Sequence, residues 1–209
     1  MSEPTLDTLV FGGTFDPIHH GHLIVARAVA ETMGVPRVLL VPAAANPLKG
    51  GAVADGPQRL DMCRLAVAED PLFSVSDIEI DRQPPSYTVD TVEQVQRQGG
   101  WGRLGVVVGA DMLDELPQWH RVEELLTAVD IIIVPRPPRT PGDVKDTLDG
   151  LRETLGTGPV ARLKQAIVHA PMIDISATQI RRRIAEGRSI RYLTPPKIAG
   201  FISKHNLYA

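Results

Sequence analysis

The sequence predicts an α/β protein built on a doubly wound parallel sheet, with a small helical part at its carboxyl end. Short apolar runs alternate with segments of helical periodicity along the whole chain, which is typical of strand–helix–strand units. Two of the runs, Leu104–Val108 and Ile131–Val134, hold only aliphatic residues and glycine, as strands buried on both faces do. A chain of 209 residues that is 43% apolar is long enough to bury one substantial core.

The individual elements follow from the same periodicities. Glycines at 34 and 187 stop two of the helices, and Pro57 opens another. The expected strands are Thr8–Phe11, Arg37–Val41, Phe73–Ile80, Leu104–Val108 and Ile131–Val134, with one or two short strands in Ile167–Ile175. The expected helices are His22–Met33, Gln58–Ala68, Thr88–Gln98, Asp143–Leu155, Ser176–Glu186 and Pro196–His205, with short helical stretches around Leu113 and Leu125.

Composition narrows the class of protein. The net charge is -3, so no global basic field attracts nucleic acid or an anionic membrane. Cys63 is the only cysteine, which excludes an internal disulfide and a cysteine-based metal site. No apolar run approaches the roughly 20 residues that span a bilayer. We therefore expect a cytoplasmic protein with no membrane or nucleic-acid partner, and a homo-oligomer is compatible with the sequence.

The first motif that carries chemistry is Gly12–His22, which reads GGTFDPIHHGH. Gly12 and Gly13 come directly after a strand, where residues without a side chain let the backbone approach a ligand. His19 and His22 lie three residues apart at the start of a helix, where backbone N–H groups favour anions. Two imidazoles at such a place indicate a phosphate site, although a tight turn with surface histidines would show part of the same pattern.

The second motif is Ile175–Arg181, ISATQIR, which again joins a strand to a helix. Ser176 followed by Gln179 is a capping box and needs no ligand. However, the helix start also offers spare N–H groups beside the hydroxyl of Thr178 and the guanidinium of Arg181. These donors together suit a polyphosphate, and the two motifs support each other.

Taken together, the two motifs resemble those of the nucleotidyltransferase superfamily, with its His-x-Gly-His loop and Ser-Ser-Thr-x-x-Arg helix start. The resemblance implies a Rossmann-like sheet in one nucleotidyltransferase domain over residues 1–209, with 176–209 as a C-terminal helical subregion. The sequence departs from the pattern at Ala177, which replaces the second serine and removes a hydroxyl but no backbone donor.

Within that superfamily the sequence is most similar to the nicotinate-nucleotide adenylyltransferases. Ser86–Thr91 resembles their helix-opening motif at the pyridine site, Gly109–Met112 their ribose-side motif, and Leu116–Trp119 their tryptophan segment. Asn46–Lys49 departs from their phosphate loop, because Leu48 replaces a histidine. The substrate-binding residues that the resemblance implies are Lys49, Thr88, Trp119 and His120.

The resemblance also implies a mechanism, in which a mononucleotide phosphate attacks the α-phosphorus of ATP and pyrophosphate leaves. Mg²⁺ would be bound mainly through the ATP phosphates, without a metal site made of protein ligands. The residues that the resemblance assigns to ATP are Gly12, Gly13, Thr14, Phe15, His19, His22, Asp111, Ser176, Thr178 and Arg181. Of these, His19, His22 and Arg181 are expected to be catalytic, and the substrates would be ATP and nicotinate mononucleotide.

Three alternatives remain open from the sequence. An adenylyltransferase for phosphopantetheine would share both phosphate motifs but lack the pyridine-site strings. A regulatory module that binds a nucleotide without catalysis would not need His19, His22 and Arg181 together. A nucleic-acid binder could use the arginines between 181 and 191, yet helical spacing scatters them around the helix and the chain is net acidic.

Overall fold

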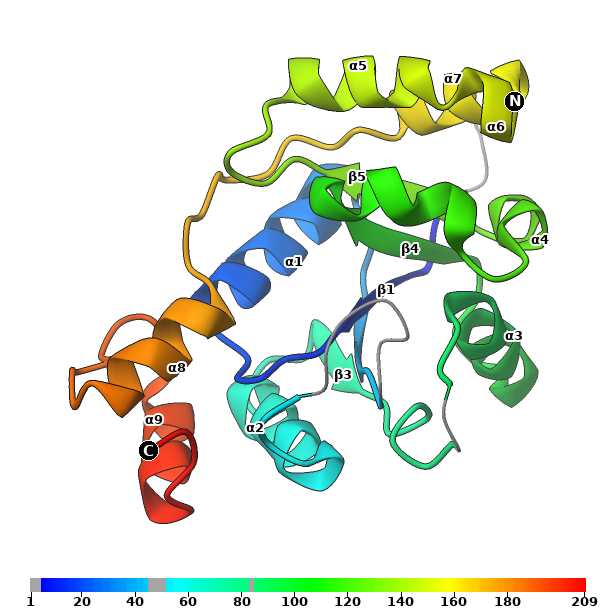
Figure 1. Cartoon of the computed structure of the whole chain (residues 1–209). Helices are drawn as coiled ribbons and strands as arrows, with labels where there is room; N and C mark the ends of the chain where they lie inside the picture. Colours follow the sequence, from blue (N-terminus) through cyan, green and yellow to red (C-terminus); the bar gives the residue numbers. More distant parts are fainter. Residues whose placement is uncertain (1–4, 45–51, 83–84) are drawn as a thin grey trace.

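The computed structural model describes residues 5–44, 52–82 and 85–209. The described strands form one parallel sheet in the order β3-β2-β1-β4-β5. This arrangement confirms the α/β class that the alternating pattern predicted (Figure 1). The strands are β1 (Thr8–Gly13), β2 (Val38–Pro42), β3 (Phe73–Val75), β4 (Leu104–Gly109) and β5 (Asp130–Val134).

Helices connect successive strands and cover both faces of the sheet (Figure 1). The helices before β5 are α1 (His20–Met33), α2 (Gly56–Val67), α3 (Thr88–Gln98), the 3-10 helix η1 (Ala110–Gln118) and α4 (Val122–Ala128). Those after β5 are α5 (Pro141–Gly150), α6 (Arg152–Leu155), α7 (Thr157–Gln165), α8 (Ala177–Ala185) and α9 (Pro196–Lys204).

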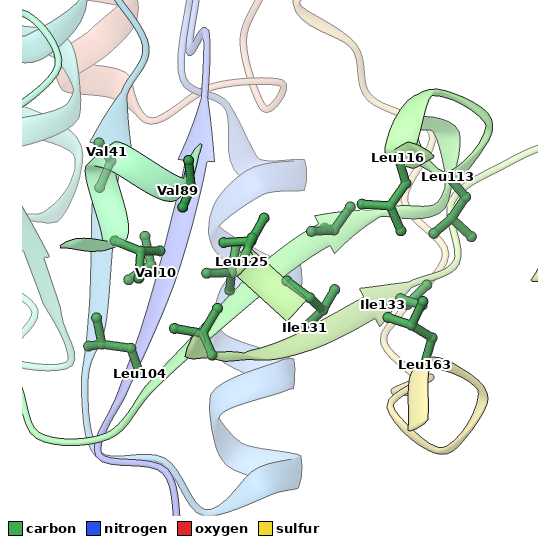
Figure 2. Close-up of a cluster of buried hydrophobic side chains, with 14 of the residues drawn as sticks. Val10, Val41, Val89, Leu104, Leu113, Leu116, Leu125, Ile131, Ile133 and Leu163 are labelled. Carbon is green, nitrogen blue, oxygen red and sulfur yellow. The ribbon is translucent and has the colours of Figure 1, made fainter. Parts of the chain in front are cut away.

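Alternate residues of each strand enter two separate cores, as the period of two along a strand requires. Val10, Leu104 and Ile131 point to the face covered by α3, η1, α4, α5 and α7, and Figure 2 shows this cluster. Leu9 and Ile132 point to the opposite face, which α1, α2 and α9 cover. Burial on both faces explains why these strands are almost purely aliphatic.

The strand order reverses at β1, and this reversal determines where a ligand can bind. The chain runs from β1 outward through β2 to β3, then returns to place β4 on the other side of β1. The connections therefore diverge above the carboxyl ends of β1 and β4, which leaves a crevice at that edge of the sheet. β1 ends at Gly13 and β4 ends at Gly109.

The prediction of a strand over Phe73–Ile80 was too long, because β3 ends at Val75. The hydroxyl of Ser76 accepts the N–H of Ile78 at 3.3 Å, and the carbonyl of Asp77 accepts the N–H of Asp81 at 2.9 Å. Local bonds of this kind compete with a strand ladder and turn the chain away. β3 is also an edge strand with β2 as its neighbour, so no second ladder holds the chain in the sheet.

The short strands expected in Ile167–Ile175 are absent from the described structure, where only a single bridge joins Ile167 to Ile133. The N–H of Ile133 donates to Ala166 and the N–H of Val168 donates to Ile133, both at 2.9 Å. Beyond this bridge the chain continues as an extended connection toward α8, and Pro171 has no N–H to extend the ladder.

The helix expected over Asp143–Leu155 is divided, and α7 was not predicted. Gly156 has a φ of 84°, which is the left-handed region, and it separates α6 from α7. Gly158 and Pro159 lie in the first turn of α7, where proline is tolerated. α5 buries Val144 and Leu148, which face the core one turn apart.

The C-terminal helical part predicted from residue 176 consists of α8 and α9, which lie together at one end of the molecule (Figure 1). α9 buries Ile198 and Ile202 in the core that α1 and α2 share. None of the described helices is both long and apolar enough to cross a bilayer.

Candidate active site

A cavity of about 720 Å³ opens at the carboxyl ends of β1 and β4, where the strand order reverses. It is lined by residues from both ends of the chain, so it joins the two phosphate motifs. Lys49 lies outside the described residues. The predicted site residues that line the cavity are Gly12, Gly13, Thr14, Phe15, His19, His22, Thr88, Asp111, Trp119, His120, Ser176, Thr178 and Arg181.

The two predicted histidines form one stacked unit at the start of α1. His19 is the N-cap residue with extended backbone, and its ring stacks on that of His22 with centroids 3.6 Å apart. Phe15 packs edge-on against His22 with centroids 5.0 Å apart. Phe15 has a φ of 49°, a left-handed conformation that is uncommon for a bulky residue. Strain of this kind is tolerated where packing fixes it, as it does here at 1% exposure.

Both histidines are held in the neutral form. Burial, reinforced by the charge of Arg136 and by His20, lowers the pKa of His19 from 6.5 to about 3. Burial, then His19 and Arg136, lower the pKa of His22 well below its usual value. A neutral imidazole carries a single N–H, so its tautomer decides which nitrogen can donate to a ligand.

Hydrogen bonding assigns that tautomer for His22. Its Nδ1 accepts the backbone N–H of His19 at 3.3 Å, so the proton must lie on Nε2. Both ring nitrogens of His19 are buried without a hydrogen-bond partner among the described residues. Because buried polar atoms are nearly always paired, these two nitrogens beside a cavity are candidates to bond a ligand.

A small residue at position 21 is required by the His19 ring. A Cβ added to Gly21 would lie 3.0 Å from Nδ1 and 3.1 Å from Cε1 of His19. Contacts this short would force the imidazole to shift by a few tenths of an ångström. The glycine of the His-x-Gly-His string therefore makes room for a side chain of the site, a role that the sequence analysis did not assign.

The second motif supplies a guanidinium and two hydroxyls at the start of α8. Ser176 caps the helix, as predicted, by accepting the N–H of Gln179 at 3.2 Å. Arg181 donates to the backbone carbonyl of Asp16 at 2.7 Å and lies 3.4 Å from the hydroxyl of Thr178. These contacts connect α8 directly to the loop after β1.

Three charged residues of the site were missed by sequence reasoning. Arg136 follows β5, lines the cavity and acts electrostatically on both histidines. Its signal was a charged side chain two residues after the end of a buried strand. Arg59 is 1% exposed and donates to the carbonyls of Thr14 and Ala43 at 2.8 and 2.6 Å, so it orders the two loops beside the cavity.

Glu79 is the third missed residue, and it is a buried acid at the other end of the cavity. The hydroxyl of Thr91 donates to its carboxylate at 2.6 Å, and Arg82 donates to that hydroxyl at 2.8 Å. Burial raises the pKa of Glu79 despite these bonds. In the sequence, Glu79 stands between two isoleucines. The strand predicted over Phe73–Ile80 puts it on the face opposite to both of them, so it was not considered as a site residue.

Aromatic side chains define the wall between α3 and η1. The ring of Tyr87, the residue before α3, stacks on His120 with centroids 4.3 Å apart, and Trp119 lines the same wall. The backbone of the next residue, Arg121, is in the left-handed region with a φ of 51°. Its guanidinium forms ion pairs with Asp90, Glu93 and Glu124. This clamp ties the Trp119–His120 segment to α3.

The arrangement therefore places a flat aromatic wall at one end of a cavity and cationic and N–H donors at the other. A parallel sheet with such donors at its switch point defines a nucleotide-binding α/β protein. The chain matches the cytidylyltransferase-like family over residues 10–183.

The match to individual relatives is more specific. The chain is 42% identical to a probable nicotinate-nucleotide adenylyltransferase of Roseiflexus sp. (strain RS-1), over 95% of this chain and 96% of the relative. It is 38% identical to a protein of the same description from Pectobacterium atrosepticum, over 96% and 98% of the two chains. The chain belongs to the nicotinate-nucleotide adenylyltransferase family.

Solved structures agree with the fold. The nicotinic acid mononucleotide adenylyltransferase of Plasmodium falciparum complexed with NaAD superposes with a TM-score of 0.73 at 16% identity, and the alignment covers 96% of each chain. The same protein complexed with APC gives a TM-score of 0.69 at 15% identity over 97% of each chain. These neighbours share the overall fold of the chain.

Proposed function

We propose that this chain transfers the adenylyl group of ATP to nicotinate mononucleotide, giving deamido-NAD and pyrophosphate in NAD biosynthesis. The observation that carries the proposal is one continuous cavity that joins the phosphate motifs to the aromatic wall. Family membership supports the same reaction, since the relatives are described as nicotinate-nucleotide adenylyltransferases.

The reaction is an in-line displacement at phosphorus. An oxygen of the mononucleotide phosphate forms a bond to the α-phosphorus of ATP, while the bond from that phosphorus to the bridging oxygen breaks and pyrophosphate leaves. The attacking phosphate is already an anion at neutral pH, so no general base is needed. Catalysis then rests on positioning and on stabilising the charge that develops at phosphorus.

His22 is the residue best placed to stabilise the α-phosphate. Because its Nδ1 accepts a backbone N–H, the N–H at Nε2 is available as a fixed donor. His19 would use one of its unpaired nitrogens in the same way. Gly12 and Gly13, with the backbone of Thr14 and Phe15, would line the phosphate chain.

The β- and γ-phosphates would bind at the start of α8. Ser176 and Thr178 offer hydroxyls there, Arg181 offers a guanidinium, and Arg136 adds a second positive charge from the segment after β5. Asp111 lines the cavity after β4 and is our candidate for the ATP ribose. Lys49 remains our candidate for the phosphate of the mononucleotide.

Mg²⁺ would reach the site bound to the triphosphate. Among the described residues, no group of three or more His, Cys, Asp or Glu side chains could hold a metal ion. The donor set at the phosphate end fits phosphate oxygens, so the ion would be coordinated mainly by the nucleotide. The chemistry that the ion supplies is neutralisation of phosphate charge.

The pyridine ring would bind at the aromatic wall. Trp119 and the stacked Tyr87–His120 pair offer flat surfaces, and the N–H groups at the start of α3, near Thr88, favour a carboxylate. An amide in the same place would present its NH₂ to donors, and unpaired groups cost about 1–3 kcal/mol. We therefore propose that the acid nucleotide is the preferred substrate.

Pyrophosphate release tests the proposal, measured with ATP and Mg²⁺ plus nicotinate mononucleotide, nicotinamide mononucleotide or phosphopantetheine. The acid nucleotide should give the highest kcat/KM, and His22→Ala should lower kcat by about a hundredfold or more. His169→Ala is the matched control, because this exposed histidine lies outside the cavity lining. A higher kcat/KM for phosphopantetheine, or a folded His22→Ala protein with more than half of the activity, would contradict the proposal.

A further inference from the structure

The carboxylate of Asp16 is a buried junction between three distant parts of the chain. It is 3% exposed and lies in the loop after β1. Its Oδ2 accepts the N–H of Val53 at 2.7 Å, and its Oδ1 accepts the N–H of Ala54 at 3.1 Å. Oδ1 also accepts the hydroxyl of Tyr208 at 2.6 Å, from the far end of the sequence.

The C-terminal segment is folded back to make this contact. Tyr208 is the second-last residue, and its φ of 66° is left-handed, as is the φ of 51° at Asn206. Chain ends usually fray unless something holds them. Here the N–H of Leu207 donates to Ile202 at 3.0 Å, and Tyr208 packs against the core that α9 covers. The end of the chain lies beside α9, as Figure 1 shows.

Asp16 is in direct contact with Arg181, the residue that we propose binds the triphosphate. The guanidinium donates to the Asp16 carbonyl at 2.7 Å and lies 3.7 Å from its Oδ2. One residue therefore shares its acceptors among Tyr208, Arg181 and two backbone N–H groups. Burial and the neighbouring Asp16 raise the pKa of the Tyr208 hydroxyl, so this group keeps its proton and remains a donor.

We propose that Tyr208 is a positioning residue that acts through Asp16 to hold Arg181 toward the triphosphate. The Tyr208 hydroxyl donates a hydrogen bond to one oxygen of the Asp16 carboxylate and stabilises part of its negative charge. Without it, Asp16 has an unfilled acceptor and attracts Arg181 more strongly, which withdraws the guanidinium from the phosphates. The inference rests on the proposed role of Arg181 and predicts a defect confined to ATP.

Tyr208→Phe tests this, because it removes the hydroxyl and keeps the ring. The KM for ATP should rise about three- to tenfold, as expected for part of a bond to a charged group. The KM for nicotinate mononucleotide should stay within about twofold. Tyr192→Phe is the matched control, since Tyr192 is 77% exposed and outside the cavity. Each variant is assayed well below its own melting temperature.

A double-variant cycle separates positioning from general stability. The Arg181→Lys variant lacks the guanidinium that Asp16 holds. In that background, the change in log KM for ATP caused by Tyr208→Phe should be less than half of the change in the wild type. Binding of a non-hydrolysable ATP analogue, measured by calorimetry, should weaken in parallel with KM.

The outcomes are distinct. A selective, non-additive rise in the KM for ATP supports the inference. Equal changes for both substrates, additive effects with Arg181→Lys, or no change would overturn it. A wild-type protein that binds the analogue but transfers no adenylyl group would instead contradict the proposed reaction, and the calorimetric comparison would still test Tyr208.

Discussion

Acidification should destabilise the fold through the stacked histidines. The folded-state pKa of His19 is lowered to about 3, whereas the unfolded chain binds the proton near 6.5. Its contribution to stability is therefore fully present above about pH 6.5 and is lost as the pH falls toward 3. His22, whose pKa is also lowered, acts in the same direction.

The magnitude can be worked out for His19 alone. At about pH 5 the unfolded side chain is almost fully protonated and the folded one is neutral. This pH lies about 1.5 units below the unfolded pKa, so protonation stabilises the unfolded state by about 2 kcal/mol. That is a large fraction of the roughly 5–15 kcal/mol that stabilises an ordinary domain. At 2% exposure, solvent screening reduces the figure little.

Urea unfolding at a series of pH values from about 7.5 to about 5 measures the effect, with His19→Asn as the comparison. The wild type should lose about 2 kcal/mol more than the variant over this range. Glu79 acts in the opposite sense because its pKa is raised, and the comparison between the two proteins cancels its contribution. A pH dependence that is the same in both proteins would refute the buried, neutral state of His19.

Three further substitutions test the geometry of the cavity. Trp119→Ala should raise the KM for the pyridine nucleotide about 5- to 150-fold and leave the KM for ATP nearly unchanged, because stacking is worth about 1–3 kcal/mol; equal effects would mean that the ring is structural. Arg121→Gln should also raise only the KM for the pyridine nucleotide, since it removes the ion pairs that tie the Trp119–His120 segment to α3. Arg97→Gln, at an exposed residue of α3, is the control and should leave that KM unchanged. Gly21→Ala should lower kcat roughly tenfold or more by displacing the His19 imidazole. Gly158→Ala is its control, because a Cβ there meets open space. Wild-type activity in Gly21→Ala would show that the ring shifts without loss of function.

The sheet and the phosphate end of the cavity could be predicted because both depend on local sequence. Aliphatic runs predicted β1, β2, β4 and β5, and each phosphate motif lies within a few residues of a helix start. The same reasoning failed where local bonds oppose the pattern, as at Ser76, where β3 ends early. α7 was not predicted either, and its first turn holds Gly158 and Pro159, which have low helix propensity.

The residues that the sequence could not identify are those whose role depends on contacts between distant segments. Arg59 and Glu79 look like ordinary charged residues, and only the fold buries them. Tyr208 is separated from Asp16 by 192 positions, a contact that no spacing rule addresses. For these residues the informative property is burial of a polar group with its partners, which exists only once the chain has folded.

The charges at the two ends of the cavity determine how a dinucleotide can be assembled in it. Arg136 and Arg181 lie at the phosphate end, and Glu79 is buried at the α3 end. A triphosphate entering the α3 end would meet this carboxylate, whereas at the other end it meets two guanidinium groups. In the proposed reaction these charges would favour one orientation of ATP, with its α-phosphate toward the acceptor phosphate. Burial raises the pKa of Glu79, so its charged form is less favoured than that of an exposed carboxylate. In the proposed reaction a nicotinate ring near Glu79 would therefore meet less repulsion than the more highly charged triphosphate would.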